Sequence, residues 1–239
     1  MRLITAWSLT LLVAVSCGKK DVPESDATAS HQFSDEEIGS YNSKKLTGLE
    51  NVLGPAHDVV GHAPIPWSEG GLVDMYYFTN GIPGTGMATM QLIKPDGSGS
   101  VPNDDGTYEL LAFTKLNFNS DTSVTNSFNQ IERRMNKFFT SIANYAMANK
   151  IQPGETTEIP EDGSVTRYLV FDAYKPGGKE FMIGGKKHGL LLIIEIHREE
   201  LEFATQYGSS ELLKRLKDAG HYPYSDLERK PVAEFESEN

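Results

Sequence analysis

The chain has 239 residues, of which 38% are hydrophobic and 10% aromatic, and a formal net charge of −11. This composition supports a folded domain with a substantial core rather than a disordered chain. The excess of acidic residues (33 Asp and Glu against 22 Lys and Arg) argues against nucleic-acid binding and against attachment to anionic lipid through charge. The single cysteine excludes an intramolecular disulfide.

The first 17 residues have the pattern of an exported lipoprotein. Arg2 precedes a mostly apolar run over residues 3–15, which fits a signal-peptide core and is too short to span a membrane. The run leads into Ala14–Cys17 (AVSC), which resembles the bacterial lipobox. We predict that residues 1–16 are a signal peptide, that Cys17 carries diacylglycerol, and that the protein is membrane-anchored in the cell envelope. The alternative is an ordinary signal peptide with an incidental cysteine.

Residues 17–43 are predicted to be the lipidated cysteine followed by a flexible polar tether. Polar residues dominate this stretch and large apolar side chains are few, so it cannot build a packed core. Folded structure is expected from Lys44. There, apolar residues recur at helical spacing until Gly54 and Pro55 end the run; they are Leu46, Leu49, Val52 and Leu53.

Three strands are predicted between residues 72 and 116. Each segment is rich in apolar and aromatic residues, and turn or loop signals separate them. The predicted strands are Leu72–Thr79, Gly86–Ile93 and Tyr108–Leu116, the first two paired as a hairpin.

The strongest periodic signal predicts a long amphipathic helix over residues 123–149. Apolar side chains recur at alternating steps of four and three along one stripe, made of Val124, Phe128, Ile131, Met135, Phe138, Ile142 and Tyr145. Phe139, Ala143 and Ala146 widen the stripe, as burial against a sheet requires. We predict a core helix; a partner-binding helix is the alternative.

A charged, turn-rich passage over residues 153–163 precedes three further predicted strands. Arg167–Tyr174 and Glu180–Ile183 come first. Gly189–Ile196 follows, and its continuous apolar run indicates a central strand covered on both faces.

Two short helices and an acidic tail are predicted at the end of the chain. They occupy Glu199–Tyr207, Ser210–Ala219 and residues 231–239. Residues 44–230 are therefore predicted to be a single layered α+β domain. Its sheet is mostly antiparallel or mixed, with the long helix packed on it.

The last third of the chain carries a composite pattern. His188–Ala204 joins a hydrophobic strand to an acidic helix start (EELEFA), and Gly208–Leu216 reads GSSELLKRL. Upstream, Val73–Phe78, Gly86-Met87 and Tyr108–Leu111 match weaker parts of the same pattern. Together these segments resemble the suppressor of fused domain family over about residues 45–230. One departure is His197, where the family more often has a Thr.

The resemblance implies a non-catalytic, protein-binding domain without a cofactor. In animals this domain sequesters a transcription factor, and bacterial relatives look like immunity proteins that neutralise toxins by direct binding. Because the chain has a net charge of −11, we also expect the protein partner to be basic.

The six histidines of the chain are the first candidates for a metal site. His57 and His62 flank Asp58, and His197 precedes an acidic helix start. A zinc site needs ligands at helical or hairpin spacing and a third ligand nearby. We therefore favour loop or surface histidines over a metal site.

A group of lysines is the main candidate binding surface. Lys175, Lys179, Lys186 and Lys187 stand out in an acidic protein. If residues 180–184 form one strand, its flanking turns lie roughly 20 Å apart, which divides the lysines into two small patches. Solvated turns are the alternative interpretation, and we favour it.

Two functions therefore remain open from the sequence. The first is a membrane-tethered binding or immunity module. The second is an envelope hydrolase or a small-ligand-binding protein, whose Asp, Glu and His groups converge only in the folded structure. A cleft with strongly perturbed titratable groups would favour the second.

Overall fold

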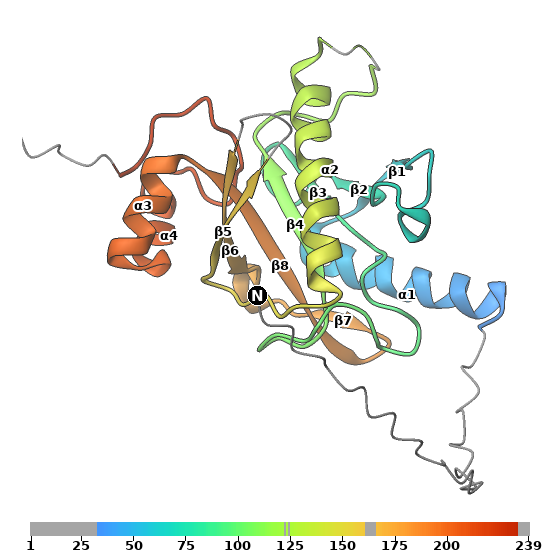
Figure 1. The fold of residues 1–239 in the computed structure, drawn as a ribbon. Helices are drawn as coiled ribbons and strands as arrows, with labels where there is room; N and C mark the ends of the chain where they lie inside the picture. The colour runs from blue at the N-terminus through green and yellow to red at the C-terminus, as the bar shows by residue number, and fades with distance from the viewer. Residues whose placement is uncertain (1–32, 122, 124, 161–165, 234–239) are drawn as a thin grey trace, which may run out of the picture. The chain divides into compact units, whose positions relative to one another are not determined.

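The computed structural model describes residues 33–121, 123, 125–160 and 166–233. These residues form one eight-stranded mixed sheet with four α-helices, so the predicted α+β class is confirmed (Figure 1). The predicted signal peptide and Cys17 lie outside the described residues. Among the described helices, none is long and apolar enough to cross a membrane.

The sheet has the strand order β1-β2-β3-β4-β8-β6-β5, and β7 forms a hairpin with one end of β8. All neighbours are antiparallel except β4 and β8, which run parallel. The strands are β1 (Ala56–Gly61), β2 (Met75–Phe78), β3 (Thr85–Ala88), β4 (Tyr108–Thr114), β5 (Thr156–Pro160), β6 (Thr166–Ala173), β7 (Phe181–Ile183) and β8 (Lys186–Ile196).

Strand β8 is central, as its continuous apolar run predicts. It lies between β4 and β6, and its residues from His188 to Ile196 are all buried. Alternate side chains enter separate cores, with Leu191 on one face of the sheet and Leu192 on the other.

Helix α2 (Ser127–Ala146) covers one face of the sheet. It begins after Asn126, whose side-chain oxygen accepts hydrogen bonds from the N–H groups of Phe128 and Asn129 at 2.8 and 3.4 Å. The predicted stripe is buried from Phe128 to Ile142, whereas Val124 lies outside the described residues. The prediction was wrong for Tyr145, which is 54% exposed because it borders a groove instead of the sheet.

Helix α1 (Asp35–Leu53) corrects the predicted tether, since helical structure begins nine residues before Lys44. Ser34 and Glu37 form a capping box, and the first turn is acidic, which stabilises a helix N-terminus. The helix is also held by an ionic contact. Lys45 is 1% exposed and donates to Glu109 Oε1 at 2.9 Å and to Met90 O at 2.7 Å.

Helices α3 (Arg198–Tyr207) and α4 (Ser209–Asp218) pack with α1 on the other face of the sheet. The fully buried Glu200 of α3 accepts two hydrogen bonds from the Arg229 guanidinium, at 2.6 and 2.8 Å. It also accepts from the Val232 N–H at 2.8 Å, and Ala233 is 1% exposed. The predicted acidic tail at 231–239 is therefore part of the fold up to residue 233. Its remaining residues lie outside the described range.

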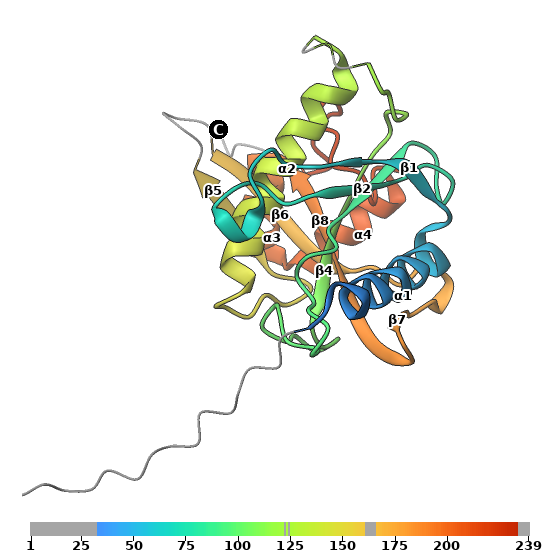
Figure 2. The same ribbon diagram turned by 90° about the vertical axis from the view of Figure 1, so that its right-hand side faces the viewer.

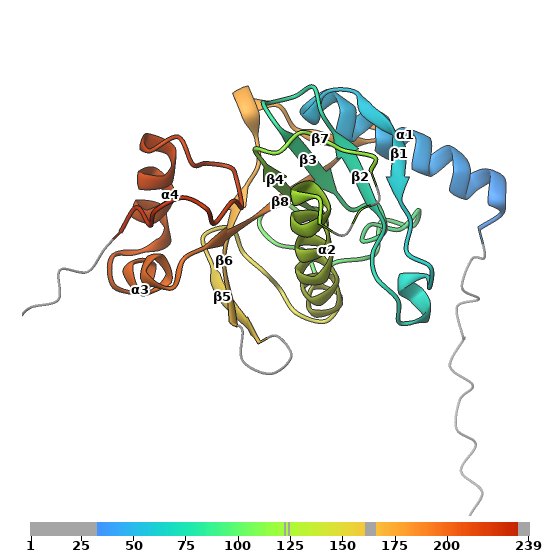
Figure 3. The same ribbon diagram turned by 90° about the horizontal axis from the view of Figure 1, so that it is seen from above.

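The two faces are covered unevenly (Figures 2 and 3). Seven strands at about 4.8 Å spacing span roughly 29 Å, whereas one helix is about 10 Å wide. Among the described residues, three helices share one face, and α2 is the only α-helix on the other. On the α2 face, the parts of the sheet beside α2 are therefore covered by loops or left uncovered.

Candidate functional site

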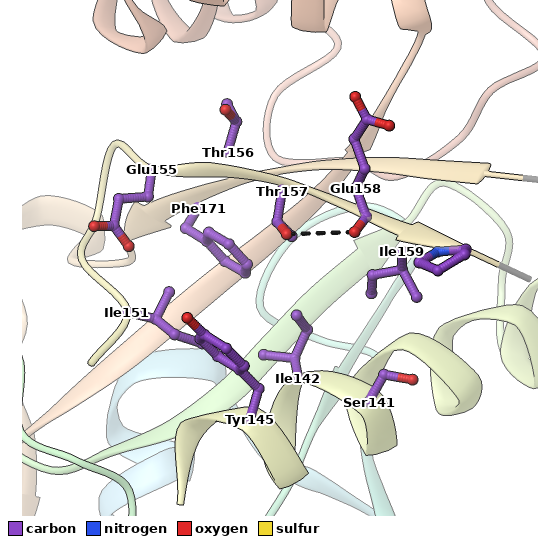
Figure 4. Close-up of a pocket in the computed structure, with 11 residues that line it drawn as sticks. Ser141, Ile142, Tyr145, Ile151, Glu155, Thr156, Thr157, Glu158, Ile159 and Phe171 are labelled. Carbon is purple, nitrogen blue, oxygen red and sulfur yellow. Dashed lines mark hydrogen bonds between the residues drawn. The ribbon is translucent and has the colours of Figure 1, made fainter. Parts of the chain in front are cut away.

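A groove runs between the second half of α2 and the edge strand β5 (Figure 4). It consists of two adjoining cavities of about 330 and 370 Å³, which share Ser141, Ile159 and Pro160. We call it the α2–β5 groove. Its remaining lining residues are Leu72, Lys137, Phe138, Thr140, Ile142, Tyr145, Ile151, Glu155, Thr156, Thr157, Glu158, Arg167 and Phe171.

The groove has an apolar floor and an aromatic rim. Phe171 of β6, Ile142 of α2 and Ile151 are all buried beneath it. Ile159 of β5 packs against the same core, as alternation along a strand requires. Tyr145 rises from α2 at one end and remains 54% exposed. Side chains from a helix and from a strand therefore face each other across a partly open apolar surface.

No described strand pairs with the outer edge of β5, where the Glu158 carbonyl oxygen has a long contact of 3.5 Å from Thr157 Oγ1 (Figure 4). The Phe171 N–H donates to Glu155 O at 2.9 Å, and the Phe171 carbonyl oxygen accepts from the Gly154 N–H at 2.7 Å, so Glu155 lies at a hydrogen-bonded position of the antiparallel ladder. Such positions alternate with non-bonded positions. The backbone groups of Thr156 and Glu158, opposite Val170 and Tyr168, therefore point away from β6. Pro160 has no N–H and ends the open stretch.

The opposite edge of the sheet differs from β5. Strand β1 pairs with β2 in a register that shifts between Ala56 and Val60. Within this irregularity the Val59 N–H donates to the His57 Nδ1, two residues earlier in the same strand, at 3.0 Å. A bulged edge is a poor template for another strand. The regular edge at β5 is therefore the better platform for a partner chain.

Charges of both signs border the groove. Glu155 lies at the end near Tyr145, and its Oε2 accepts from the Gln152 N–H at 2.9 Å. Lys137 and Arg167 line the other end. Arg167 pairs with the buried Glu195 at 2.7 Å. A partner chain that lies in the groove would therefore contact an acidic group at one end and basic groups at the other.

Three tyrosines whose pKa is raised by burial lie outside this groove. Burial raises the pKa of Tyr41, Tyr108 and Tyr174 to about 12, which keeps each of them protonated at neutral pH. None of the three lines the α2–β5 groove. Within the described ranges, no group of three or more His, Cys, Asp or Glu could hold a metal ion.

The lysines of the candidate surface lie outside this groove. Lys175 forms an ion pair with Asp105, and Lys187 with Glu180. Lys179 and Lys186 are exposed on either side of β7. Two of the four lysine charges thus already have an acidic partner. Their role as a binding surface stays a prediction.

The three singled-out histidines lie apart in separate environments. The His57 ring stacks on Phe118 at 4.2 Å between centroids. His62 Nδ1 lies 3.0 Å from Asp74 Oδ2, and His197 Nε2 lies 3.0 Å from the carbonyl oxygen of Arg229. Each has a local structural partner.

Sequence reasoning missed the α2–β5 groove. Residues 153–163 were predicted to be a charged, turn-rich passage because β5 has no apolar run. In the structure the residues of β5 are half-buried or exposed. The one available signal was Thr156–Ile159, where β-branched residues alternate with a charge. Tyr145 was assigned to the core because helical periodicity does not show where the covering sheet ends.

No protein-family model matches the chain, and no curated protein matches it. Among the solved structures that are similar to it are two with 14% sequence identity and a TM-score of 0.51 each. One is a suppressor of fused homolog from Neisseria gonorrhoeae, where the match covers 82% of this chain and 99% of the other. The second is the Sufu–Fu complex, with 82% and 92% covered. The fold is therefore suppressor of fused-like, as the sequence resemblance predicts.

Proposed function

We propose that this protein is a non-catalytic binding module that captures an extended segment of a partner protein in the α2–β5 groove. The observation that carries this proposal is the open, regular edge of β5 beside a partly open apolar surface. An added strand would gain main-chain hydrogen bonds at Thr156 and Glu158. Its alternate side chains would enter the groove and supply specificity. The structural likeness to the Sufu–Fu complex supports a protein partner.

The size of the groove suits a short segment. Along α2, Lys137 and Tyr145 are eight residues apart, about 12 Å at the helical rise. An extended chain covers that distance in about four residues. The partner therefore needs only a short exposed or unstructured stretch. A net charge of −11 favours a basic partner protein and faster association at low salt.

The proposed place of action is the cell envelope. A lipid on Cys17 would hold the domain at a membrane, and the residues between Cys17 and α1 would give it reach. A toxin that attacks the envelope, or that is intercepted there on entry, is the partner class that an immunity role would require. Cys17→Ala should abolish lipid labelling and release the protein from washed membranes. Retention of the variant on membranes at high salt would reveal a different anchor.

The groove can be tested by site-specific photocrosslinking in cells that make the full chain. A crosslinking amino acid at Tyr145 should trap a partner, whereas one at Tyr207 should not. Both side chains are similarly exposed, at 54% and 57%, and Tyr207 lies on α3. The same products from both positions would argue against the groove.

The backbone contact has its own matched pair of variants. Thr156→Pro removes an outward N–H without removing a β5–β6 hydrogen bond, whereas Thr156→Val keeps the N–H. The partner that crosslinking identifies is then purified in its free form. Titration with it should give saturable one-to-one binding by wild type and Thr156→Val. Thr156→Pro should bind at least tenfold more weakly. Equal binding by all three would exclude strand addition at β5.

The enzyme alternative predicts a different result. An envelope hydrolase would convert a small substrate or degrade the partner, and one Asp, Glu or His replacement would abolish that turnover. Stoichiometric binding with both proteins recovered intact supports the binding module. Turnover by the purified protein that is lost with a single such replacement would overturn it.

A further inference from the structure

A further cavity is lined by residues of β1, β2 and the first half of α2, and none of its lining residues belongs to the α2–β5 groove. Its volume is about 240 Å³, and the proposed binding of an extended chain makes no use of it. We call it the Glu132 pocket. The lining residues used in the argument are Gly61, Tyr77, Phe118, Asp121, Glu132 and Arg133.

The carboxylate of Glu132 is held in place from below. Tyr77 of β2 is 2% exposed, and its hydroxyl donates a hydrogen bond to Glu132 Oε1. Strand β1 crosses directly over this contact at Gly61, where a Cβ atom would lie 2.3 Å from the phenol oxygen. The phenol therefore has little freedom and fixes one carboxylate oxygen. Among the described residues, the other oxygen, Oε2, has no hydrogen-bond partner.

The aromatic wall of the pocket is also ordered. The half-buried Phe118 ring packs against His57, Tyr77 and Phe128, with centroid distances of 4.2, 4.9 and 5.4 Å. Beside this ring, the buried Asn129 donates to the carbonyl oxygen of Ser123 at 2.8 Å and to that of Asp121. Asp121, which lines the pocket, is thus held to α2 through its carbonyl oxygen.

The charges in the pocket are not neutralised internally. Glu132 and Asp121 form no ion pair with any residue of the described part of the chain, and Arg133 is the one basic residue lining the pocket. A fixed carboxylate next to an aromatic face is the usual chemistry for holding an organic cation. The carboxylate accepts charge-assisted hydrogen bonds while the ring attracts the positive charge. An anion or a neutral apolar group would gain neither contact.

We propose that the Glu132 pocket binds an alkylammonium or guanidinium group, with Glu132 Oε2 as acceptor and Phe118 as the aromatic wall. The cation can come from a lysine or arginine side chain of a protein or from a free polyamine. Tyr77 acts as a positioning residue, because its hydroxyl holds one carboxylate oxygen of Glu132, and Gly61 leaves room for that phenol.

The test uses the full-length protein, in lipid nanodiscs if it purifies with membranes, and ligand-observed NMR. The probes are the capped tripeptides acetyl-Gly-Lys-Gly-amide and acetyl-Gly-Arg-Gly-amide, the neutral acetyl-Gly-Gln-Gly-amide, and spermidine. At least one cationic probe should bind saturably, and the Gln peptide should not. Glu132→Gln should weaken binding at least tenfold, whereas Glu211→Gln, on the exposed surface of α4, should leave it unchanged.

Added salt and a second variant separate a direct contact from a folding defect. Binding should weaken at 0.5 M salt, as expected for a charged contact near the surface at a Debye length of about 4 Å. Tyr77→Phe should also weaken it while the ring packing and thermal midpoint stay close to wild type. Tighter binding by a peptide or by spermidine identifies the source of the cation. Equal binding of the Gln peptide, unchanged binding by Glu132→Gln, or no binding of any cationic probe would overturn the proposal.

Discussion

The two faces of the sheet are built differently. On one face, α1, α3 and α4 cover the strands, and the buried acids Glu109 and Glu200 are saturated with hydrogen bonds. On the other face α2 is the only α-helix in the described part of the chain, and cavities lie on both sides of it. Three helices and satisfied buried charges make the first face a scaffold, although cavities of about 390 and 430 Å³ border α1 and α4 there. The incomplete cover of the second face leaves room for ligands, so we place both proposed sites there.

The largest expected effect on the scaffold face is at Lys45. Lys45→Met removes the cation but leaves Glu109 fully buried, which should destabilise the protein by about 3–5 kcal/mol. The double variant Lys45→Met/Glu109→Gln should recover part of that loss, because no buried charge remains unpaired. Urea denaturation of the three proteins measures both values. A loss below about 1 kcal/mol for Lys45→Met would mean that α1 does not depend on this ion pair.

Phe138 tests the core on the other face. The side chain is 1% exposed, so Phe138→Ala should cost about 3–5 kcal/mol of unfolding free energy. Lys137→Ala, one residue away and exposed, should change it by no more than about 0.5 kcal/mol. Similar losses at the two positions would contradict the placement of α2 on the sheet.

The pH dependence of stability reports on Glu200. Burial alone would raise its pKa, but hydrogen bonds from Arg229 and from the Val232 and His197 N–H groups outweigh burial and lower it. A lowered pKa means stabilisation that is present above the ordinary value of 4.5 and is lost as the pH falls below it. Wild type should therefore lose stability more steeply than Glu200→Gln between pH 5 and about 3. Parallel curves for the two proteins would argue against this effect.

The smallest expected effect on folding is at Tyr145. Because the side chain is 54% exposed, Tyr145→Ala should change the free energy of unfolding by less than about 1 kcal/mol. It should nevertheless weaken partner binding at least tenfold, since the ring borders the α2–β5 groove. Calorimetric titration of the partner, alongside thermal unfolding, separates the two quantities. A strongly destabilised variant would place Tyr145 in the core after all.

Elements with one strong local signal were predictable. The apolar run of β8 and the alternating steps of four and three in α2 specify both their type and their burial. The composite pattern from His188 to Leu216 was enough to predict the suppressor of fused-like fold. In each case the driving force is burial of apolar side chains, and periodicity in the sequence reports it directly.

The sequence by itself determined the central strand, the core stripe of α2 and the fold class. Only the tertiary structure decided where that stripe runs past the sheet, so that Ile142 is buried and Tyr145 is not. It alone brought Lys45 to Glu109 and Tyr77 to Glu132 across 64 and 55 residues. Those contacts depend on which strands are neighbours, and local patterns carry no record of strand order. The open edge of β5 is of the same kind, because an edge strand is defined by the neighbour it lacks.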